Sequence, residues 1–365
     1  SSFKCQFFKC HMKQKIVFFT ARDLSNVGGG ERMLSLIANG LCDSFSITIL
    51  TPYEAESFYP FDERITIENL GFKNRKLSVL RKLQYFPILR KLQCFLHQTD
   101  ICRFIACSSM AIILTSIIGN KDDERLMAWI HTSFYHPTPF YLRKIMLSNL
   151  YKFKIVCINS MDMEQYRKYA TDVIKIPNPL PFTTEIKSRC NMKRLIAVGR
   201  LEKWKRFDLM IKSCARVLSE YDDWVLDIYG QDDGEKKRLN ALIKENNMQG
   251  RIRLHAPVEN IQSEYIKSSI FVTTSRIEAF SLVLLEACES GIPCIAYDVP
   301  SGPRDIVQNG YNGYLIQELN NESFELQLSK LMESETLRKK MGKNAILKAQ
   351  EFEFAKILDL WKRQL

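Results

Sequence analysis

Two glutamates in the second half of the chain have a spacing that suits an extended ligand. Glu278 lies in a polar loop after the apolar residues 270–274, and Glu286 follows eight positions later within the apolar residues 282–288. A carboxylate in apolar surroundings needs hydrogen-bond donors, and paired sugar hydroxyls supply them well. One carboxylate could therefore meet each end of a hydroxyl-rich ligand. As a lone spacing, two such glutamates more often reflect surface charge.

A cluster of cations follows the predicted strand at residues 195–198. Arg200 and Lys205 belong to this cluster, which precedes an amphipathic segment that begins at Phe207. Ligands of open α/β sheets bind at the carboxyl ends of the strands. Arg200 could hold a diphosphate through paired hydrogen bonds, and Lys205 could add a compact positive charge. A solvated cationic loop is the alternative interpretation.

Three consecutive glycines, Gly28, Gly29 and Gly30, separate a short apolar segment from an amphipathic one near the beginning of the chain. Glycine lets a backbone approach a ligand, and a helix N-terminus offers free N–H groups to an anion. A tight strand-to-helix turn explains the same glycines. Met33 stands where a dinucleotide-binding fingerprint needs glycine, and the chain has no P-loop motif. The dehydrogenase and P-loop interpretations therefore lose their main support.

Predicted strands and helices alternate along both halves of the chain. Segments typical of strands occur at residues 15–20, 46–51, 65–70, 102–106, 126–130 and 154–159, and then at 195–198, 224–229, 252–255 and 270–274. The segments between them have helical period. This alternation predicts an α/β fold with mainly parallel, doubly wound sheets.

A proline-rich segment at residues 176–182 interrupts the alternation near the middle of the chain. We place the domain boundary there, with residues 12–178 as the first domain and 179–345 as the second. Residues 346–365 are predicted to form a terminal helix that could cross back to the first domain. Residues 1–11 lack the apolar core of a signal peptide, and we interpret them as a tag or leader.

The composition is that of a globular protein. The chain has 365 residues, 46% of them hydrophobic and 25% charged, which suits about two domains. No apolar run reaches the ~20 residues that a membrane-spanning helix needs. The 11 cysteines form no C-x-x-C pair and no metal-ligand spacing, as expected in a reducing compartment.

The net charge of +11 lies mostly in the first half of the chain. Between residues 70 and 99 there are seven basic side chains and no acidic one, interleaved with leucines at helical spacing. Residues 73–92 could form a helical face that packs its leucines into the core, or they could attach to an anionic membrane surface at about 1 kcal/mol per basic residue. Nucleic-acid binding is disfavoured because aromatic side chains do not interleave as a stacking platform requires.

Taken together, these motifs resemble the retaining glycosyltransferases of family 4, which have the two-domain GT-B fold. The resemblance extends from Met12 to about Lys348. It rests on a set of short motifs: Gly28-Gly29-Gly30-Glu31-Arg32, Gly199-Arg200-Leu201 with Lys205, Phe207-Asp208, Tyr229-Gly230, Ser275 with the Glu-x7-Glu pair, and Gly310-Tyr311-Asn312-Gly313. It implies two Rossmann-like domains facing across a cleft, the first binding the acceptor and the second the nucleotide sugar.

The resemblance also assigns roles to residues. It implies that Glu286 holds the ribose hydroxyls of the donor, that Glu278 holds hydroxyls of the transferred sugar, and that Arg200 and Lys205 neutralise the leaving diphosphate. His131 matches the active-site histidine of the family, although a core or turn role also fits a residue that follows an apolar strand. The other residues assigned to donor binding are Gly29, Gly30, Gly230, Ala279, Phe280, Ser281 and Leu282.

Two departures from the family pattern affect the donor pocket. The family commonly has glycine at the positions of Ala279 and Ser281, and after the phosphate-binding lysine, where this chain has Arg206. A Cβ at a position that needs positive φ is strained. We therefore expect a pocket of altered shape, and the sugar is the least defined part of the prediction.

The resemblance implies a hexosyltransferase that moves a hexose or N-acetylhexosamine from a nucleotide-diphosphate sugar, UDP-linked, to a saccharide acceptor with retention of configuration. A lipid-linked acceptor in O-antigen or capsule synthesis, at the inner face of the cytoplasmic membrane, would fit the basic residues 73–92. The chain has no Asp-x-Asp triplet, so we expect no metal and no other cofactor. A nucleotide-sugar epimerase or hydrolase, and a non-catalytic assembly subunit, remain as alternatives.

Overall fold

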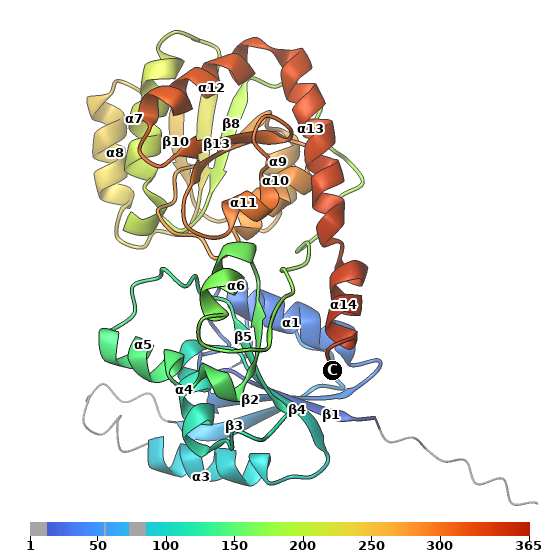
Figure 1. Cartoon of the computed structure of the whole chain (residues 1–365). Coiled ribbons are helices and arrows are strands. Elements are labelled where there is room, and N and C mark those ends of the chain that lie inside the picture. The colour runs from blue at the N-terminus through green and yellow to red at the C-terminus, as the bar shows by residue number, and fades with distance from the viewer. Residues whose placement is uncertain (1–12, 55, 73–84) are drawn as a thin grey trace, which may run out of the picture. The chain divides into compact units, whose positions relative to one another are not determined.

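The computed structural model describes residues 13–54, 56–72 and 85–365 (Figure 1). The chain forms two compact units. The first contains Ser1–Trp129, Phe140–Ile155 and Gln364–Leu365, and the second contains Ile130–Pro139 and Val156–Arg363. Residues 156–178, which the sequence analysis placed in the first domain, group with the second unit. The predicted tag or leader at residues 1–11 and the basic residues 73–84 lie outside the described part of the chain.

The first sheet has seven strands within the described residues, in the order β3-β2-β1-β4-β5-β6-β7. Their bounds are β1 (Lys15–Phe19), β2 (Ser46–Tyr53), β3 (Thr66–Phe72), β4 (Ile101–Ala106), β5 (Leu126–Ile130), β6 (Lys154–Cys157) and β7 (Val173–Lys175). The pairings of β1 with β2 and β4, of β2 with β3, and of β4 with β5 are parallel. Four of the five residues of β1 are fully buried, as expected for a strand covered on both faces.

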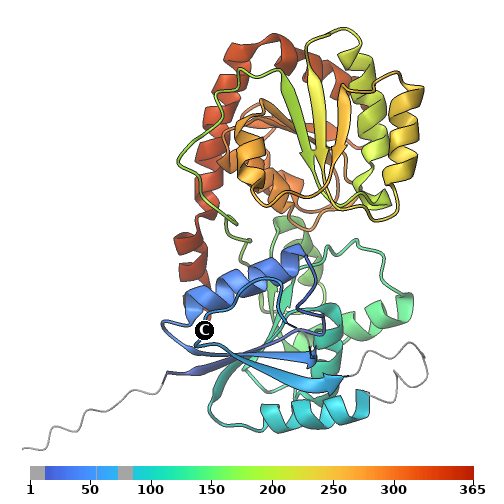
Figure 2. The ribbon, with the colours of Figure 1, turned by 180° about the vertical axis from the view of Figure 1, so that it is seen from behind.

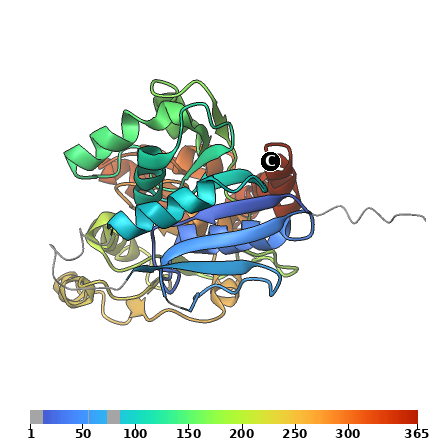
Figure 3. The same ribbon diagram turned by 90° about the horizontal axis from the view of Figure 1, so that it is seen from below.

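Helices cover both faces of this sheet. Figures 1 and 3 show α1 (Gly29–Leu41) on one face and α3 (Tyr85–Leu96) on the other. In α3, Ile88 and Leu92 are buried one turn apart while Arg90 and Lys91 are exposed. The described part of the basic segment therefore packs its apolar side inward. The next helices are α4 (Ser109–Ile118), α5 (Phe140–Leu147), the short η1 (Leu150–Lys152) and α6 (Ser160–Tyr166).

The second unit contains a six-stranded parallel sheet, seen from behind in Figure 2, in the order β10-β9-β8-β11-β12-β13. Its strands are β8 (Arg194–Val198), β9 (Val225–Tyr229), β10 (Ile252–His255), β11 (Ile270–Thr273), β12 (Cys294–Asp298) and β13 (Gly313–Gln317). The strand order reverses between β8 and β11. The loops that follow these two strands therefore meet at the switch point where open α/β sheets bind ligands.

The helices of the second unit complete the alternation that the sequence predicts. They are the 3-10 turn η2 (Lys203–Lys205), α7 (Phe207–Leu218), α8 (Lys236–Glu245), α9 (Ile261–Ile266), α10 (Leu282–Glu289), α11 (Pro303–Ile306), α12 (Asn321–Glu333), α13 (Glu335–Ala349), η3 (Gln350–Phe352) and α14 (Phe354–Lys362). The last two residues group with the first unit, where Arg103 of β4 donates from Nε to the Gln364 carbonyl at 3.3 Å. Of the helices in the described ranges, none is both long and apolar enough to cross a bilayer.

Candidate active site

Two predicted catalytic residues meet at the switch point of the second sheet. The Lys205 ammonium, in the loop after β8, donates to Glu278 Oε1 at 2.7 Å, in the loop after β11. Both side chains are mostly buried, with 21% of the lysine and 10% of the glutamate exposed. An incoming diphosphate can compete for Lys205, which leaves the Glu278 carboxylate to accept hydrogen bonds from hydroxyl groups.

Hydrogen bonds between the two loops hold Lys205 in place. The Thr274 hydroxyl donates to the carbonyl of Lys205 at 3.2 Å and to that of Arg206 at 2.9 Å. The backbone N–H of Arg276 donates to the Trp204 carbonyl at 2.8 Å, and the Arg276 guanidinium lies 5.5 Å from the centre of the Trp204 ring. The ion pair is therefore built on a fixed backbone junction.

Glu286 lies further along α10, where it is 4% exposed. Its Oε2 accepts a hydrogen bond from the hydroxyl of Tyr265 at 3.0 Å, and Tyr265 itself is fully buried. The carboxylate is thus held in one orientation in a mainly apolar environment. Such a group binds further hydroxyl donors strongly, because water does not compete for it.

The loop between the two glutamates contains one strained residue. Ser281, at the N-cap of α10, has a φ of 63°, and Arg206 has a φ of 48°. Ala279 has no positive φ, so the expectation of strain there is wrong, whereas the expectation for Ser281 is correct. The Ser281 hydroxyl is buried and has no hydrogen-bond partner within the described residues. The N-terminus of α10 therefore lacks a side-chain cap.

We expect replacement of Ser281 by glycine to stabilise the protein. Ser281→Gly relieves a left-handed conformation that costs an L-residue roughly 1–2 kcal/mol, offset in part by the entropy of glycine in the unfolded chain, about 0.5–1 kcal/mol. Ser281→Ala removes the same hydroxyl but keeps the strain. In urea unfolding, the glycine variant should be the more stable of the two; a more stable alanine variant would contradict this assignment of strain.

Arg200 is not part of the Lys205–Glu278 pair. Its side chain is 57% exposed and donates to Glu202 at 3.1 Å and to Asp233 at 3.3 Å. Contact of Arg200 with a diphosphate therefore requires its guanidinium to leave these two carboxylates. Its assignment to the leaving group stays a prediction.

Gly230 has a steric role at the end of β9. A Cβ at this position would lie 1.8 Å from the carbonyl oxygen of Gly199, which follows β8. The residue before it, Tyr229, stacks on His255 at 4.6 Å, and burial together with a hydrogen bond to Glu264 raises its pKa to about 12. The absence of a side chain at Gly230 thus lets the ends of two strands approach each other.

Gly230→Ala should destabilise the protein much more than the matched change Gly199→Ala. A Cβ at Gly199 would meet only side-chain atoms of Lys205 and Phe207, at 3.4–3.5 Å, which is ordinary contact distance. Overpacking typically costs 1–3 kcal/mol, and because the clash at Gly230 is with backbone we expect a loss of about 3 kcal/mol in urea unfolding. Equal losses of unfolding free energy in the two variants would show that the close approach of Gly230 to the Gly199 carbonyl does not contribute to stability.

The loop that carries His131 is held within the second unit by a buried polar network. The Ser133 and Ser301 hydroxyls share a hydrogen bond of 2.8 Å, and Ser301 also donates to Asp162 at 2.6 Å. Burial raises the pKa of Asp162, although hydrogen bonds from Ser301 and Asn159 oppose this. The Asn159 amide donates to Asp162 and to the Ala279 carbonyl, each at 2.8 Å. The network therefore links the loop of His131 to the loop of Glu278.

Gly29 and Gly30 open helix α1 in the first unit. Helix α1 begins after Gly28, which has no side chain that could cap the first N–H groups of the helix. The carboxylate of Glu31, in the first turn, accepts a long hydrogen bond of 3.4 Å from Arg22. The N–H groups at this end are therefore not capped by a side chain, as an anion-binding terminus requires.

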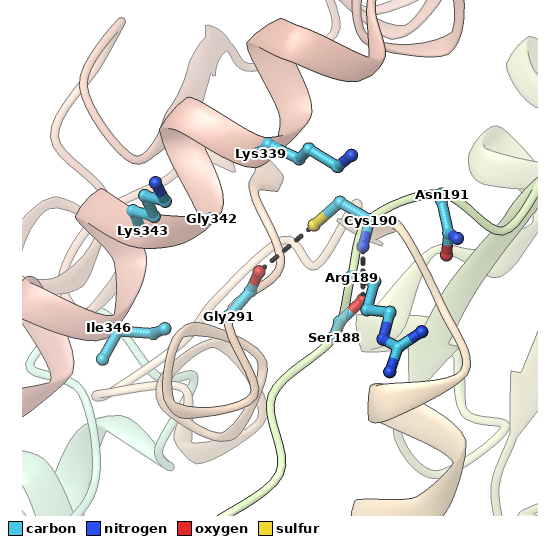
Figure 4. Close-up of a pocket in the computed structure, with 9 residues that line it drawn as sticks. All are labelled: Ser188, Arg189, Cys190, Asn191, Gly291, Lys339, Gly342, Lys343 and Ile346. Carbon is cyan, nitrogen blue, oxygen red and sulfur yellow. Dashed lines mark hydrogen bonds between the residues drawn. The ribbon is translucent and has the colours of Figure 1, made fainter.

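A pocket elsewhere in the second unit contains none of the predicted site residues. It lies between the segment before β8 and helix α13, and it is lined by Ser188, Arg189, Cys190, Asn191, Gly291, Lys339, Gly342, Lys343 and Ile346. Figure 4 shows its cationic side chains pointing in different directions. Among the residues that the structure describes, no three histidine, cysteine or acidic side chains gather as a metal site.

Comparison with known proteins identifies a family domain in the second half of the chain. The model of the "Glycosyl transferases group 1" family matches residues 185–348, a range that includes Lys205, Glu278 and Glu286. An uncharacterized glycosyltransferase of Haemophilus influenzae is 25% identical over 355 residues, which cover 96% of this chain and 99% of that protein.

Two further matches extend over nearly the whole chain. A Campylobacter jejuni protein named as a GalNAc-alpha-(1->4)-GalNAc-alpha-(1->3)-diNAcBac-PP-undecaprenol alpha-1,4-N-acetyl-D-galactosaminyltransferase is 22% identical over 345 residues, 92% of this chain and 94% of that protein. The crystal structure of Anabaena Alr3699/HepE in complex with UDP-glucose superposes with a TM-score of 0.75 at 17% identity, covering 96% of this chain and 98% of that one. The predicted GT-B fold is confirmed, and this chain is a glycosyltransferase with a glycosyl transferases group 1 domain at residues 185–348.

Proposed function

We propose that this enzyme transfers a hexose or N-acetylhexosamine from a UDP-sugar to a hydroxyl of a saccharide acceptor, with retention of configuration, as a member of family 4. The observation that carries the proposal is the Lys205–Glu278 ion pair at the switch point of the second sheet, with Glu286 on the helix that follows. The UDP-glucose bound to the structurally similar Anabaena protein supports the choice of donor.

The charge distribution of the site suits departure of a diphosphate. In glycosyl transfer, positive charge grows on the sugar ring while negative charge grows on the leaving group. The Lys205 ammonium and the uncapped N-terminus of α10 can stabilise the leaving group without moving. Glu278 would then accept hydroxyls of the transferred sugar, Glu286 those of the ribose, and Arg200 would add a second cation at the diphosphate.

His131 would serve the acceptor side of the reaction. It directly follows β5, and its loop is fixed by the Ser133–Ser301 hydrogen bond. An imidazole near the reacting sugar can accept a hydrogen bond from a hydroxyl and orient it. Gly29 and Gly30, at the uncapped start of α1, would donate backbone N–H groups to the donor.

We further propose a lipid-linked acceptor in the assembly of a bacterial surface polysaccharide. The Campylobacter relative, whose name specifies a saccharide linked to undecaprenol through a diphosphate, supports this acceptor class. An enzyme with such an acceptor works at the inner face of the cytoplasmic membrane, and residues 73–92 carry enough positive charge to attract it to anionic lipid.

A donor screen tests the proposal. The enzyme is incubated with UDP-glucose, UDP-galactose, their N-acetyl forms and GDP-mannose, together with mixed lipid-linked saccharides, and nucleotide release and products are measured. We expect one UDP-sugar to give an acceptor-linked product. Free sugar alone would indicate a hydrolase, an altered nucleotide sugar would indicate an epimerase, and no turnover of any donor would favour a non-catalytic subunit.

Chelation should leave turnover unchanged. The proposed site neutralises the diphosphate with lysine, arginine and a helix N-terminus, so it needs no divalent cation. Initial rates in excess EDTA should equal those in untreated enzyme. Complete loss of activity that Mg²⁺ or Mn²⁺ restores would overturn this part of the proposal.

A further inference from the structure

Asn159 is a buried amide that contacts the loop of Glu278 from a distant part of the chain. Its side chain is fully buried at the N-cap of helix α6. Its Oδ1 accepts a hydrogen bond from the backbone N–H of Asp162 at 2.7 Å, which determines the orientation of the amide. The amide nitrogen therefore faces the Ala279 carbonyl and the Asp162 carboxylate, and it donates to each at 2.8 Å.

The hydrogen bond from Asn159 fastens the backbone at Ala279, directly after Glu278. Before Glu278, the backbone N–H of Arg276 donates to a carbonyl of the 3-10 turn η2 at 2.8 Å. The backbone is thus held two residues before the glutamate and one residue after it. Torsions within the side chain are then the main freedom that Glu278 keeps. These two anchors therefore set where its carboxylate lies, 2.7 Å from the Lys205 ammonium.

A second segment packs against the backbone of Phe280, the next residue of the same loop. A Cβ at Gly302 would lie 3.0 Å from the backbone N and Cα of Phe280, so the two backbones are in close contact. Ser301 donates to Asp162 at 2.6 Å, and the same carboxylate accepts from Asn159. One buried carboxylate therefore joins the two segments that hold this loop.

Helix α6, which Asn159 caps, is itself fixed within the second unit. The backbone N–H and the hydroxyl of Ser160 donate to the Asp305 carboxylate of α11 at 3.1 and 2.7 Å. Lys175 of β7 pairs with the same carboxylate at 3.1 Å. The Asn159 amide therefore donates to the loop of Glu278 from an element whose own position is fixed.

We propose that Asn159 is a positioning residue for glycosyl transfer, which holds the Glu278 carboxylate where it meets the transferred sugar. The inference deepens the proposed function, since it rests on the role proposed there for Glu278. Asn159 acts through the loop, because its amide is buried and donates to protein oxygens. Misplacement of a group by about 1 Å can cost about 10²-fold in rate. The nucleotide is assigned to Glu286 on α10, so UDP affinity should not depend on Asn159.

Asn159→Ser tests the proposal, because serine keeps a capping oxygen for α6 but removes the amide that donates to Ala279. The matched control is Asn320→Ser. Asn320 caps α12 in the same way, with a hydrogen bond of 2.9 Å from the Ser323 backbone, and it is exposed. We expect kcat to fall roughly 10–100-fold in Asn159→Ser and to stay within about twofold of wild type in the control. Titration calorimetry should give the wild-type dissociation constant for UDP in both variants.

Two further measurements separate positioning from a loss of stability. Asn159→Thr keeps the capping oxygen and more of the side-chain volume, and it should show the same fall in kcat with wild-type UDP affinity. In a double-mutant cycle, Asn159→Ser should lower the kcat of Glu278→Gln by less than about twofold, because a residue that acts through Glu278 has no carboxylate left to position. A purely structural role would give no such coupling to Glu278.

The outcomes distinguish failure of this inference from failure of the proposed function. A lowered kcat in Glu278→Gln together with wild-type kcat in Asn159→Ser would overturn the inference alone. Parallel losses of kcat and UDP affinity in both Asn159 variants, or full additivity with Glu278→Gln, would also overturn it, since they indicate a general structural role. Wild-type kcat in Glu278→Gln would instead refute the role of Glu278 in the proposed function.

Discussion

Replacing Lys205 by methionine should lower kcat by about 10²–10³, the range expected when one preorganised charge donor to a transition state is removed. The ammonium contacts Glu278 at 2.7 Å and is positioned by the Thr274 hydrogen bonds to the backbone. Its charge is needed most when the diphosphate departs. The KM for the donor should therefore change less than kcat. Initial rates at varied donor concentration measure both constants.

The matched control for this variant is Lys203→Met. Lys203 belongs to the same 3-10 turn and is exposed. Substitution of an exposed charged residue that makes no buried contact usually has little effect, so Lys203→Met should leave kcat and the donor KM within about twofold of the wild-type values. Lys205→Arg, which keeps the charge, should recover part of kcat. Equal kcat values for the Lys203 and Lys205 variants, or a Lys205 effect on KM alone, would remove Lys205 from the leaving-group role.

Replacing Glu286 by glutamine should weaken UDP binding by roughly 100-fold. A hydrogen bond to a charged group contributes about 1.5–3 kcal/mol, and the loss of one or two of them from ribose hydroxyls corresponds to this factor. Glutamine preserves the shape of the side chain and can still accept from the Tyr265 hydroxyl. Titration calorimetry with UDP gives the dissociation constants of both proteins directly.

Glu289→Gln provides a control within the same helix. Glu289 is also buried, but its carboxylate accepts hydrogen bonds from the Thr184 backbone and from the Lys187 ammonium. This variant should lower the free energy of unfolding and leave UDP affinity unchanged. Wild-type UDP affinity in Glu286→Gln would show that α10 does not hold the ribose through this carboxylate.

The sequence predicted β8 and β11, the strands that position the site, but missed β12 and β13 at the other edge of the same sheet. Strands β8 and β11 are short apolar segments that are followed by Gly199 and by a polar loop, respectively, and both signals are local. Strand β13 begins with Gly313, which resembles a turn residue. In the structure, a Cβ at Gly313 would lie 2.1 Å from the Cys294 carbonyl of β12. The glycine thus serves close packing of two strands, which periodicity does not reveal.

The residues that support the site were harder to predict than those in it. Lys205 and Glu278 stand in motifs, yet their direct contact depends on the pairing of β8 with β11, a crossover that no local pattern specifies. Asn159, Asp162 and Ser301 are single polar residues far apart in the sequence. Their burial and mutual hydrogen bonds arise only in the folded unit, so no sequence signal identifies them.

The most direct test of glycosyl transfer is proton NMR of the product formed from an α-linked UDP-sugar and a lipid-linked saccharide. If the assignment is right, UDP and a new glycosidic linkage appear in equal amounts, only when acceptor is present, and the anomeric proton shows the α configuration of the donor. A product of inverted configuration, or UDP release that yields free sugar with and without acceptor alike, would contradict it.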